Sequence, residues 1–344
     1  MRAGDVFRAW GLILQGRKPT LSIEITKECP LRCPGCYAYE DHHLGGEVVL
    51  RQLSDYRGDQ LVSRILALAD SYQPLHLSLV GGDPLVRYRE VEQVLPLLLG
   101  RGIHVQLVTS AFRPMPETWR DYSNFTLSVS VDGLQAEHDV RRTPATYDRI
   151  LKNISNQKVT IHCTVTGQMM KRDGYLEEFL RFWSAVPQVE KVWISLFTPQ
   201  RGDERPEILT TEERHRVVAE LHGLRGKFRK LAMPARLVDH FANTPASPKE
   251  CIFAHVTETI SADFTTRITP CQFGGDPDCS QCGCMASMAL AAVGSYKIGG
   301  LIPASALFHG SAKIGSFLFG SNRAGNLETP PRLVPISPLP VDRK

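Results

Sequence analysis

Several features that would place a protein in a special class are missing from this sequence. No window holds 18 uninterrupted apolar residues, so no transmembrane helix is predicted. The 40 Lys and Arg residues and the 36 Asp and Glu residues are interspersed, without the basic clusters that are typical of nucleic-acid-binding proteins. The N-terminal residues lack an apolar core followed by a small-residue cleavage site, so no signal peptide is predicted. We therefore expect a cytoplasmic protein without a nucleic-acid partner.

The nine cysteines, by contrast, are unevenly placed. Cytoplasmic thiols stay reduced, so this number indicates metal ligands more than disulfides. Three cysteines fall within 29–36 and five within 251–284. The ninth, Cys163, lies among the apolar positions of a predicted strand and is interpreted as a packed core thiol.

Short β-type runs alternate with amphipathic helical segments along most of the chain. The strand candidates cover 21–26, 75–80, 104–109, 125–132, 159–166 and 192–197. The helical segments between and after them cover 52–71, 86–101, 143–156, 174–186 and 210–230. Alternation at this spacing predicts right-handed βαβ units and a parallel sheet.

Several of these strands alternate strictly between apolar and polar residues, whereas buried parallel strands are usually continuous apolar runs. Leu127 and Val129 share one face of the fourth strand, and Ser128 and Ser130 share the other. The polar faces must line a wet cavity, while a closed eight-stranded barrel has an apolar interior. The predicted fold class is therefore α/β, a partial (β/α)6 barrel of parallel strands. On such polar faces, Glu24 and His162 are either substrate contacts or members of a structural network.

The character of the chain changes near Cys251. Five cysteines, a predicted hairpin (256–261 returning as 265–269) and Gly–Gly–Asp–Pro turn chemistry indicate a small metal-stapled extension. A helix is expected over 285–293, and five prolines predict a flexible tail over 329–344. The expected organisation is a leader (1–20), a barrel domain (21–235), a cysteine-rich extension (236–328) and this tail.

The first cysteine group reads Cys29–Pro–Leu–Arg–Cys33–Pro–Gly–Cys36 and directly follows the first strand. Three thiolates ligate three irons of a cubane and leave the fourth iron open, because full ligation needs four cysteines. A zinc knuckle is the alternative, although it wants four ligands in a closed site. The place after a barrel strand, where barrel active sites form, favours the cluster.

This spacing is the motif of the radical S-adenosylmethionine (SAM) superfamily, and Tyr37 stands where that family usually has an aromatic residue. Gly81–Gly82–Asp83–Pro84 follows the second strand and resembles the family's GGEP element, with Asp in place of Glu. The resemblance implies that the backbone and the acid of this element hold the methionine amino group of SAM. Thr109–Ser110 occupies the place of the family's T-N-G, where a further SAM contact is implied.

A third stretch runs from Ser128 through Ser130 and Asp132 to Gly133 and continues as His138–Asp139–Val–Arg–Arg142. It resembles the S-[IL]-D-G…H-D-x-x-R stretch of members that carry C-terminal auxiliary clusters. The resemblance implies SAM contacts from Ser130 and Arg142, with Asp132 nearby.

The second cysteine group reads Cys251-x19-Cys271-x7-Cys279-x2-Cys282-x-Cys284. Its opening resembles the SPASM or twitch extension, which holds auxiliary [4Fe–4S] clusters. Five cysteines imply one such cluster, and which four of them ligate it stays open. Zinc is the alternative metal, because C-x2-C pairs also suit zinc.

The resemblance implies an enzyme that reductively cleaves SAM at a [4Fe–4S] cluster to a 5′-deoxyadenosyl radical, which abstracts hydrogen from a substrate. An electron donor such as flavodoxin or ferredoxin is implied, and the oxidoreductase or transferase class is undetermined. We favour a peptide or a polar small molecule as substrate. A lipid or isoprenoid is the alternative, since the apolar stretch over 285–318 offers a lipid path. A non-enzymatic zinc or iron–sulfur protein is the remaining alternative, and membrane association is not predicted.

Overall fold

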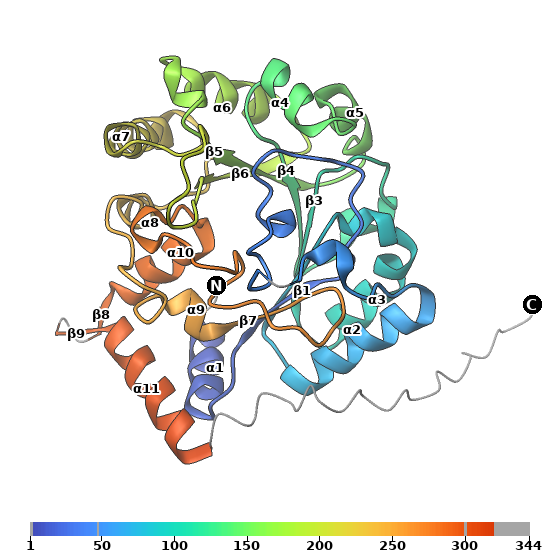
Figure 1. Cartoon of the computed structure of the whole chain (residues 1–344), viewed down its shortest axis with the longest axis vertical. Helices are drawn as coiled ribbons and strands as arrows, with labels where there is room; N and C mark the ends of the chain where they lie inside the picture. The colour runs from blue at the N-terminus through green and yellow to red at the C-terminus, as the bar shows by residue number, and fades with distance from the viewer. Residues whose placement is uncertain (1–2, 47, 299–300, 320–344) are drawn as a thin grey trace, which may run out of the picture.

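The computed structural model describes residues 3–46, 48–298 and 301–319, so the predicted tail over 329–344 lies outside the described residues. A parallel sheet of seven strands forms the centre of the molecule, in the order β6-β5-β4-β3-β2-β1-β7 (Figure 1). The strands are β1 (Thr20–Glu24), β2 (His76–Val80), β3 (His104–Thr109), β4 (Phe125–Ser130), β5 (Val159–Val165), β6 (Val189–Leu196) and β7 (Thr257–Ile260).

The first six strands lie in the sheet in the same order as in the chain. A doubly wound fold would reverse its strand order at a switch point, which this sheet does not do. The sheet is open, since β6 and β7 are its two end strands. The structure therefore confirms the α/β class and the partial barrel.

The strict alternation of the strands also has the predicted consequence. One face packs beneath the helices and forms the core, in which each of the following residues is at most 1% exposed: Leu21, Ile23, Leu77, Leu79, Val105, Leu107, Val129, Ile161 and Cys163. Burial raises the pKa of the Cys163 thiol to about 12. Cys163 is thus a core residue, as its sequence position predicted.

The helices that connect the strands are α2 (Gly58–Tyr72), α3 (Tyr88–Gly100), α4 (Gln135–Arg142), α5 (Tyr147–Asn153), α6 (Tyr175–Ala185) and α7 (Thr211–Lys227). The helix predicted over 52–71 begins only at Gly58, because Lys27 binds the Leu53 carbonyl and Arg87 pairs with Asp55. The helix predicted over 143–156 begins at Tyr147, since Pro144 disfavours helical backbone at the residue before it.

The open side of the partial barrel is closed by helices from both ends of the chain. They are α1 (Ala3–Leu14), α8 (Ala235–Asp239), α9 (Ile252–Val256), α10 (Met285–Gly294) and α11 (Ala304–Phe319), with the small hairpin β8 (Lys297–Ile298) and β9 (Ile302–Pro303) beside them (Figure 1). The helix predicted over 285–293 is thus confirmed as α10, whereas α1 and α11 were not predicted. Within the described residues, no helix is long and apolar enough to cross a membrane.

The predicted hairpin over 256–269 is present, but with few paired residues in its return arm. Its first arm is β7, and its return arm makes two ladder bonds, from the Ser261 amide to the Thr266 carbonyl (2.8 Å) and from the Ile268 amide to the Thr259 carbonyl (3.0 Å). Unexpectedly, β7 also pairs in parallel with β1. The extension thereby contributes a strand to the main sheet, next to the strand that leads into the first cysteine group.

Candidate active site

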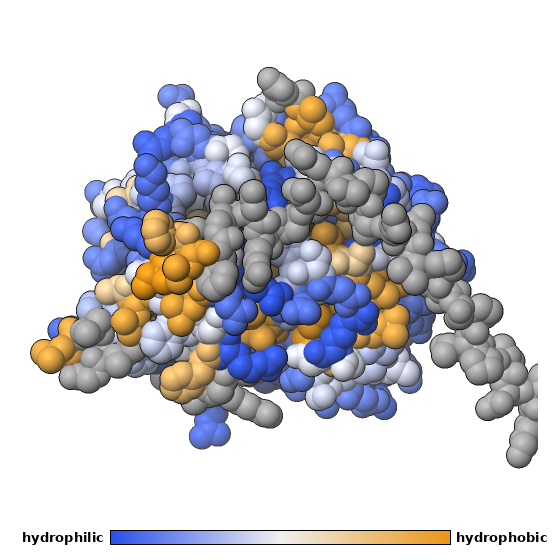
Figure 2. All heavy atoms as spheres, turned by 90° about the horizontal axis from the view of Figure 1, so that it is seen from below, coloured by the Kyte–Doolittle hydropathy of each residue, from blue (hydrophilic) through white to orange (hydrophobic). Residues whose placement is uncertain are grey.

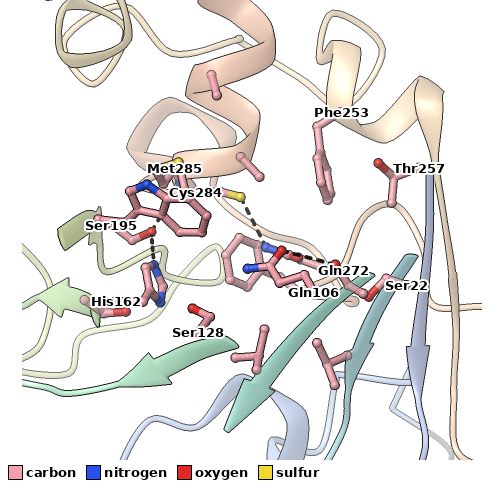
Figure 3. A pocket seen from close by; sticks show the side chains of 18 of the residues that line it. Ser22, Gln106, Ser128, His162, Ser195, Phe253, Thr257, Gln272, Cys284 and Met285 are labelled. Carbon is pink, nitrogen blue, oxygen red and sulfur yellow. Dashed lines mark hydrogen bonds between the residues drawn. The ribbon is translucent and has the colours of Figure 1, made fainter. Parts of the chain in front are cut away.

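A cavity of about 1430 Å³ lies on the concave side of the sheet. We call it the main cavity. Cys29, Cys33 and Cys36 line it together with the Gly81–Gly82–Asp83 turn. The polar strand faces line it as predicted, with Ser22, Ser78, Gln106, Ser128, Ser130, His162, Thr164 and Ser195 (Figure 3). The structure thus gathers most of the residues that the sequence singled out around one space.

The three thiols of the first group are half-buried at the entrance to this cavity. Burial raises the pKa of Cys29 to about 12 and that of Cys36 to about 11, and the neighbouring thiols of the group add to both shifts. Thiolates in such surroundings are costly unless a bound cation compensates their charge. Three convergent thiols that face a large cavity fit a cluster with one open iron.

The Gly81–Gly82 turn lies against the segment that leads into these cysteines. The Gly82 amide donates to the Thr26 carbonyl (2.8 Å), and the Asp83 amide donates to the Glu28 carbonyl (2.9 Å). A Cβ atom on Gly82 would lie 2.0 Å from the Glu28 carbonyl oxygen, so only glycine permits this approach. The turn after β2 therefore fixes the position of residues 29–36 after β1, which we call the cysteine loop.

The Asp83 carboxylate is buried and accepts four hydrogen bonds from the protein. The donors are the Leu85 amide (3.0 Å), the Thr109 hydroxyl (2.7 Å), the Ser110 amide (2.9 Å) and the Ser110 hydroxyl (2.5 Å). A carboxylate offers about four lone-pair sites, and all are used here. The carboxylate thus ties the end of β2 to the end of β3, and a bound amino group would have to displace one donor or use carbonyl groups of the turn.

Asp132 and Arg142 form a buried ion pair beside the cysteine loop, with 2.8 Å between Arg142 Nε and Asp132 Oδ2. Arg141 adds a second contact to the same oxygen at 3.4 Å, which the sequence did not predict. Burial alone would raise the pKa of Asp132, but the two guanidinium groups outweigh it and lower the pKa to about 2. Asp132 is therefore an anion that holds two cations at the cavity wall.

His138 positions this ion pair. Its Nδ1 accepts from the Asp132 amide (3.1 Å), so the proton sits on Nε2, which donates to the Ala145 carbonyl (2.8 Å). Burial lowers the pKa of His138 to about 4, and the ring is neutral. The side chain of Asp139 accepts from the Tyr147 amide (2.8 Å) at the start of α5. The His–Asp part of the motif is thus structural.

Tyr37 joins the cysteine loop to the cysteine-rich extension. Its ring packs edge-to-face on Phe273 and on His43, with centroid distances of 5.3 and 5.5 Å. His43 in turn lies 2.9 Å from Glu24 through Nε2 and 3.1 Å from the Phe273 carbonyl through Nδ1. Both partners are acceptors, so His43 carries both ring protons. Burial alone would lower its pKa, but Glu24 outweighs burial and raises it.

The Glu24 carboxylate also accepts from the Ser261 hydroxyl at 2.6 Å. Glu24 therefore belongs to a buried network that ties β1, the cysteine loop and the extension together. Sequence reasoning left open whether Glu24 was a ligand or a network member, and it missed His43 altogether. His43 has no spacing or motif around it that could have marked it.

All five cysteines of the second group line one small pocket, which Pro245, Pro248 and Pro277 help to close. Burial raises the pKa of Cys271 to about 12 and that of Cys282 to about 11, and neighbouring thiols add to both shifts. Cys284 also lines the main cavity, where its sulfur accepts from Gln272 Nε2 at 3.2 Å (Figure 3). Within the described residues, no three His, Cys, Asp or Glu side chains are arranged to hold a single metal ion.

Comparison with known proteins gives a family model and several solved structures. Residues 23–182 match the model of the Radical SAM superfamily. No curated protein matches the chain. SuiB from Streptococcus suis bound to the precursor peptide SuiA has 15% identity and a TM-score of 0.54, over 90% of this chain and 67% of that one. anSMEcpe with bound AdoMet, which is SAM, and the Kp18Cys peptide has 13% identity and a TM-score of 0.52, over 78% and 80%.

A second SuiB structure, bound to SAM, has 14% identity and a TM-score of 0.50, over 72% of this chain. This chain spans 57% of the length of that SuiB chain. At such identities the likeness to solved structures is one of fold, and the family assignment comes from the matched domain. The family implies a [4Fe–4S] cluster and SAM. Residues 23–182 are thus similar to the radical SAM domain, and this match covers less than half of the chain.

Proposed function

We propose that Cys29, Cys33 and Cys36 hold the [4Fe–4S] cluster that the family implies, and that the protein cleaves SAM reductively in the main cavity. This proposal rests on the observation that the proposed site residues surround the same cavity. The three thiols, the glycine turn after β2 and the Asp132–Arg142 pair all line one cavity at the carboxyl ends of the strands, where barrel active sites form.

When bound, such a cluster would supply the one electron needed to cleave the sulfonium C–S bond of SAM to methionine and a 5′-deoxyadenosyl radical, which would take a hydrogen atom from the substrate. The chain's own residues bind and orient SAM. Arg142, a cation next to Cys33, suits the carboxylate of SAM, and Ser130 offers a hydroxyl on the same wall. The Gly81–Gly82 backbone suits the amino group, because glycine lets a ligand approach closely.

We further propose that the second cysteine group holds one auxiliary [4Fe–4S] cluster. The five buried or half-buried thiols line one small pocket, which brings enough cysteines together for one cluster. The small pocket and the main cavity share Gln272, Phe273 and Cys284 in their walls, which supports an auxiliary cluster close to the proposed substrate.

Cys251, Cys271, Cys279 and Cys282 are the proposed ligands of the auxiliary cluster. Cys284 differs from these four because it alone also lines the main cavity and accepts a side-chain hydrogen bond there. Individual Cys→Ser variants test the assignment through the iron content and the electron paramagnetic resonance spectrum of the reduced protein.

Anaerobic reconstitution tests the proposed function. The protein is expected to bind about eight irons, four in each of two clusters, and to convert SAM to 5′-deoxyadenosine with dithionite or reduced flavodoxin or ferredoxin. A content of only about four irons in the intact protein would remove the auxiliary cluster. Absence of SAM cleavage would overturn the proposal as a whole.

The substrate has two candidate classes. A peptide is supported by the titles of the similar structures, since SuiB was solved with a precursor peptide and anSMEcpe with the Kp18Cys peptide. A lipid-like molecule is supported by this chain's own cavity, whose second wall is apolar. We place the enzyme in the cytoplasm, where its thiols stay reduced.

A further inference from the structure

The main cavity has two walls of opposite character. The polar strand faces form one wall. The helices that close the barrel form the other, through Ile13, Ile252, Phe253, Val256, Met285, Ala286, Ala289, Leu290, Val293 and Phe308. Figure 3 shows Phe253 and Met285 on the far side of the cavity from Ser22, Gln106 and Ser128. A molecule that fills the cavity must therefore be apolar along one side and form hydrogen bonds along the other.

The polar wall carries hydroxyl and amide groups rather than charges. The Ser78 hydroxyl lies 3.4 Å from Gln106 Oε1, and His162 Nε2 lies 2.8 Å from the Ser195 hydroxyl. Burial lowers the pKa of His162 and of His76 to about 4, so both rings are neutral. A charged substrate group placed against this wall would lose its water without gaining a counter-ion. The wall thus favours neutral hydrogen-bonding groups.

The charged residues that line the cavity either come from the helices that close the barrel or are engaged in ion pairs or hydrogen bonds. Arg8 belongs to α1 and Arg236 to α8, where Arg236 Cζ lies 4.2 Å from the centroid of the Tyr296 ring. Arg142 is paired with Asp132, and Arg205 contacts Glu40 (2.7 Å) and Asp203. Both pairs belong to the cysteine-loop end, where SAM is proposed to bind. The substrate side of the polar wall is therefore left with its hydroxyl and amide groups.

The two edges of the sheet are covered by the chain itself. Beyond β6, the Val192 amide donates to the Lys230 carbonyl (2.7 Å), and Ala232 donates back to Val192 (3.1 Å). Beyond β7, Thr266 and Ile268 pair with the strand and its end. Extended peptides are commonly bound by strand addition to a free sheet edge, and among the described residues both end strands are already partnered. Strand addition at either edge of this sheet is therefore disfavoured as a way to bind an extended peptide.

The apolar wall continues to the molecular surface. Ile13 of α1 and Phe308 of α11 line the cavity, while other apolar side chains of this corner are exposed: Phe7, Leu301, Ile314, Phe317 and Leu318. Phe317 is 87% exposed. Figure 2 views the molecule from the side of α1 and α11 and shows several separate groups of apolar atoms among hydrophilic ones. Exposed apolar residues that gather on one face are typical of sites that receive hydrophobic partners.

From this two-sided cavity we infer that the substrate is an uncharged amphiphile, a hydrocarbon body that carries hydroxyl or amide groups. Its hydrocarbon lies along α9 and α10, and its polar groups face Ser22, Gln106 and Ser128. The inference rests on the proposed function and adds the chemical class of the substrate. It selects a lipid-like molecule over a peptide.

Displacement of a fluorescent probe tests this inference on the reconstituted full chain. N-phenyl-1-naphthylamine, a neutral apolar dye, is expected to bind with enhanced fluorescence. Glycerol monolaurate, which has a hydrocarbon chain and hydroxyl groups, should displace the dye. Laurate should displace it about tenfold less well or worse, because its carboxylate would lie against the polar strand wall, which offers no counter-ion. A capped, uncharged nonapeptide should displace it least.

Two substitutions on α10 form a matched pair. Ala289 lines the apolar wall, and Ala291 is absent from it. Ala289→Trp fills the cavity and should weaken glycerol monolaurate binding about tenfold, whereas Ala291→Trp should bind like the wild type. On the polar wall, Gln106→Leu keeps the size of the side chain and should weaken glycerol monolaurate about three- to tenfold while dye binding stays unchanged.

SAM cleavage by the wild-type protein is measured in parallel. If the protein cleaves SAM but neither binds the dye nor responds to Ala289→Trp, the substrate inference is wrong and the proposed function stands. Stronger displacement by the peptide or by laurate than by glycerol monolaurate also overturns the inference. Loss of SAM cleavage in the wild type contradicts the proposed function, while the dye and the matched variants still report on the cavity.

Discussion

The two cysteine groups use the same side chain in opposite settings. Cys29, Cys33 and Cys36 are half-buried and face a cavity of about 1430 Å³. In the second group all but Cys271 are buried, and prolines help to close their pocket. The first group thus lines a space large enough to admit another molecule, whereas the second lines a small pocket. Burial around a thiol, rather than the cysteine spacing alone, distinguishes the two.

Both groups are nevertheless positioned by the same device, a glycine packed on backbone. Gly82 lies against the Glu28 carbonyl, just before Cys29, and Gly283, between Cys282 and Cys284, lies against the Leu196 carbonyl at the end of β6. An added Cβ would come within 2.0 Å of the carbonyl oxygen at the first site and within 1.9 Å at the second. Each cysteine group is thus positioned by a close glycine–backbone contact near the end of a strand of the same sheet.

The largest expected effect comes from removing one thiol of either group. Cys33→Ala should abolish SAM cleavage and lower the iron content from about eight to about four, because a three-thiol site cannot lose a ligand and keep its cluster. Cys279→Ser should lose the other four irons and still cleave SAM. Iron analysis and chromatography of 5′-deoxyadenosine measure both. Equal loss of SAM cleavage in the two variants would contradict the division of roles.

Substitution of Gly82 or of Gly283 should affect one cysteine group at a time, and less severely than the loss of a thiol. Gly82→Ala pushes the Glu28 backbone and hence the Cys29 loop, and should lower the rate of SAM cleavage about 100-fold. Gly283→Ala should lower the auxiliary iron content and leave SAM cleavage largely intact. Gly100→Ala is the control, since a Cβ there meets nothing within 4 Å. A normal cleavage rate in Gly82→Ala would show that the turn does not position the loop.

The Glu24–His43 pair should link the stabilities of the two regions. Glu24→Gln leaves a buried imidazolium without its anion and should lower the free energy of unfolding by about 3 kcal/mol or more. Glu177→Gln removes pairs with Arg181 and Lys227 that water screens, and should lower the free energy of unfolding far less than Glu24→Gln. Urea unfolding under anaerobic conditions compares them. Similar costs for both variants would argue against a tether between the regions.

The smallest expected effect is a pH dependence of the free energy of unfolding that comes from His138. The pKa of His138 is about 4 when folded, below its unfolded value near 6.5. Its contribution is therefore fully present above pH 6.5 and is lost as the pH falls toward 4, at about 1.4 kcal/mol per pH unit. His138→Asn should remove that part of the slope in unfolding free energy between pH 7.5 and 5.5. An unchanged slope would show that His138 is not buried in its neutral form.

Much of the barrel and of the first cysteine group could be predicted from the sequence. The alternation of Leu127 and Val129 with Ser128 and Ser130 is a local pattern. It predicted both the sheet and the polar face that lines the cavity. The placement of Cys29, Cys33 and Cys36 after β1 followed from their order in the chain. Such features depend on residues that are close together in sequence.

The contacts between regions could not be predicted, because they join distant residues without a spacing rule. The pairing of β7 with β1, the Glu24–His43 pair and the second cation at Asp132 are of this kind. The helices α1 and α11 were missed, and their partners are distant in sequence: Ile13 of α1 packs with Ile252 and Val256 of α9, and Trp10 donates to Ser311 at 2.6 Å. The four bonds to Asp83 likewise depend on how β3 ends beside β2.

The parallel pairing of β7 with β1 has a consequence for how the protein is made. Ser261 donates to Glu24 across 237 residues of sequence. A ribosome adds about 5 to 20 residues per second, so this partner emerges on the order of 10 to 50 s after β1. Until then, one flank of the strand that precedes Cys29 has no neighbour, and the open side of the barrel is not yet closed. Delivery of iron and sulfide to the first cysteine group is therefore expected to finish only after β7 and Ser261 have been synthesised.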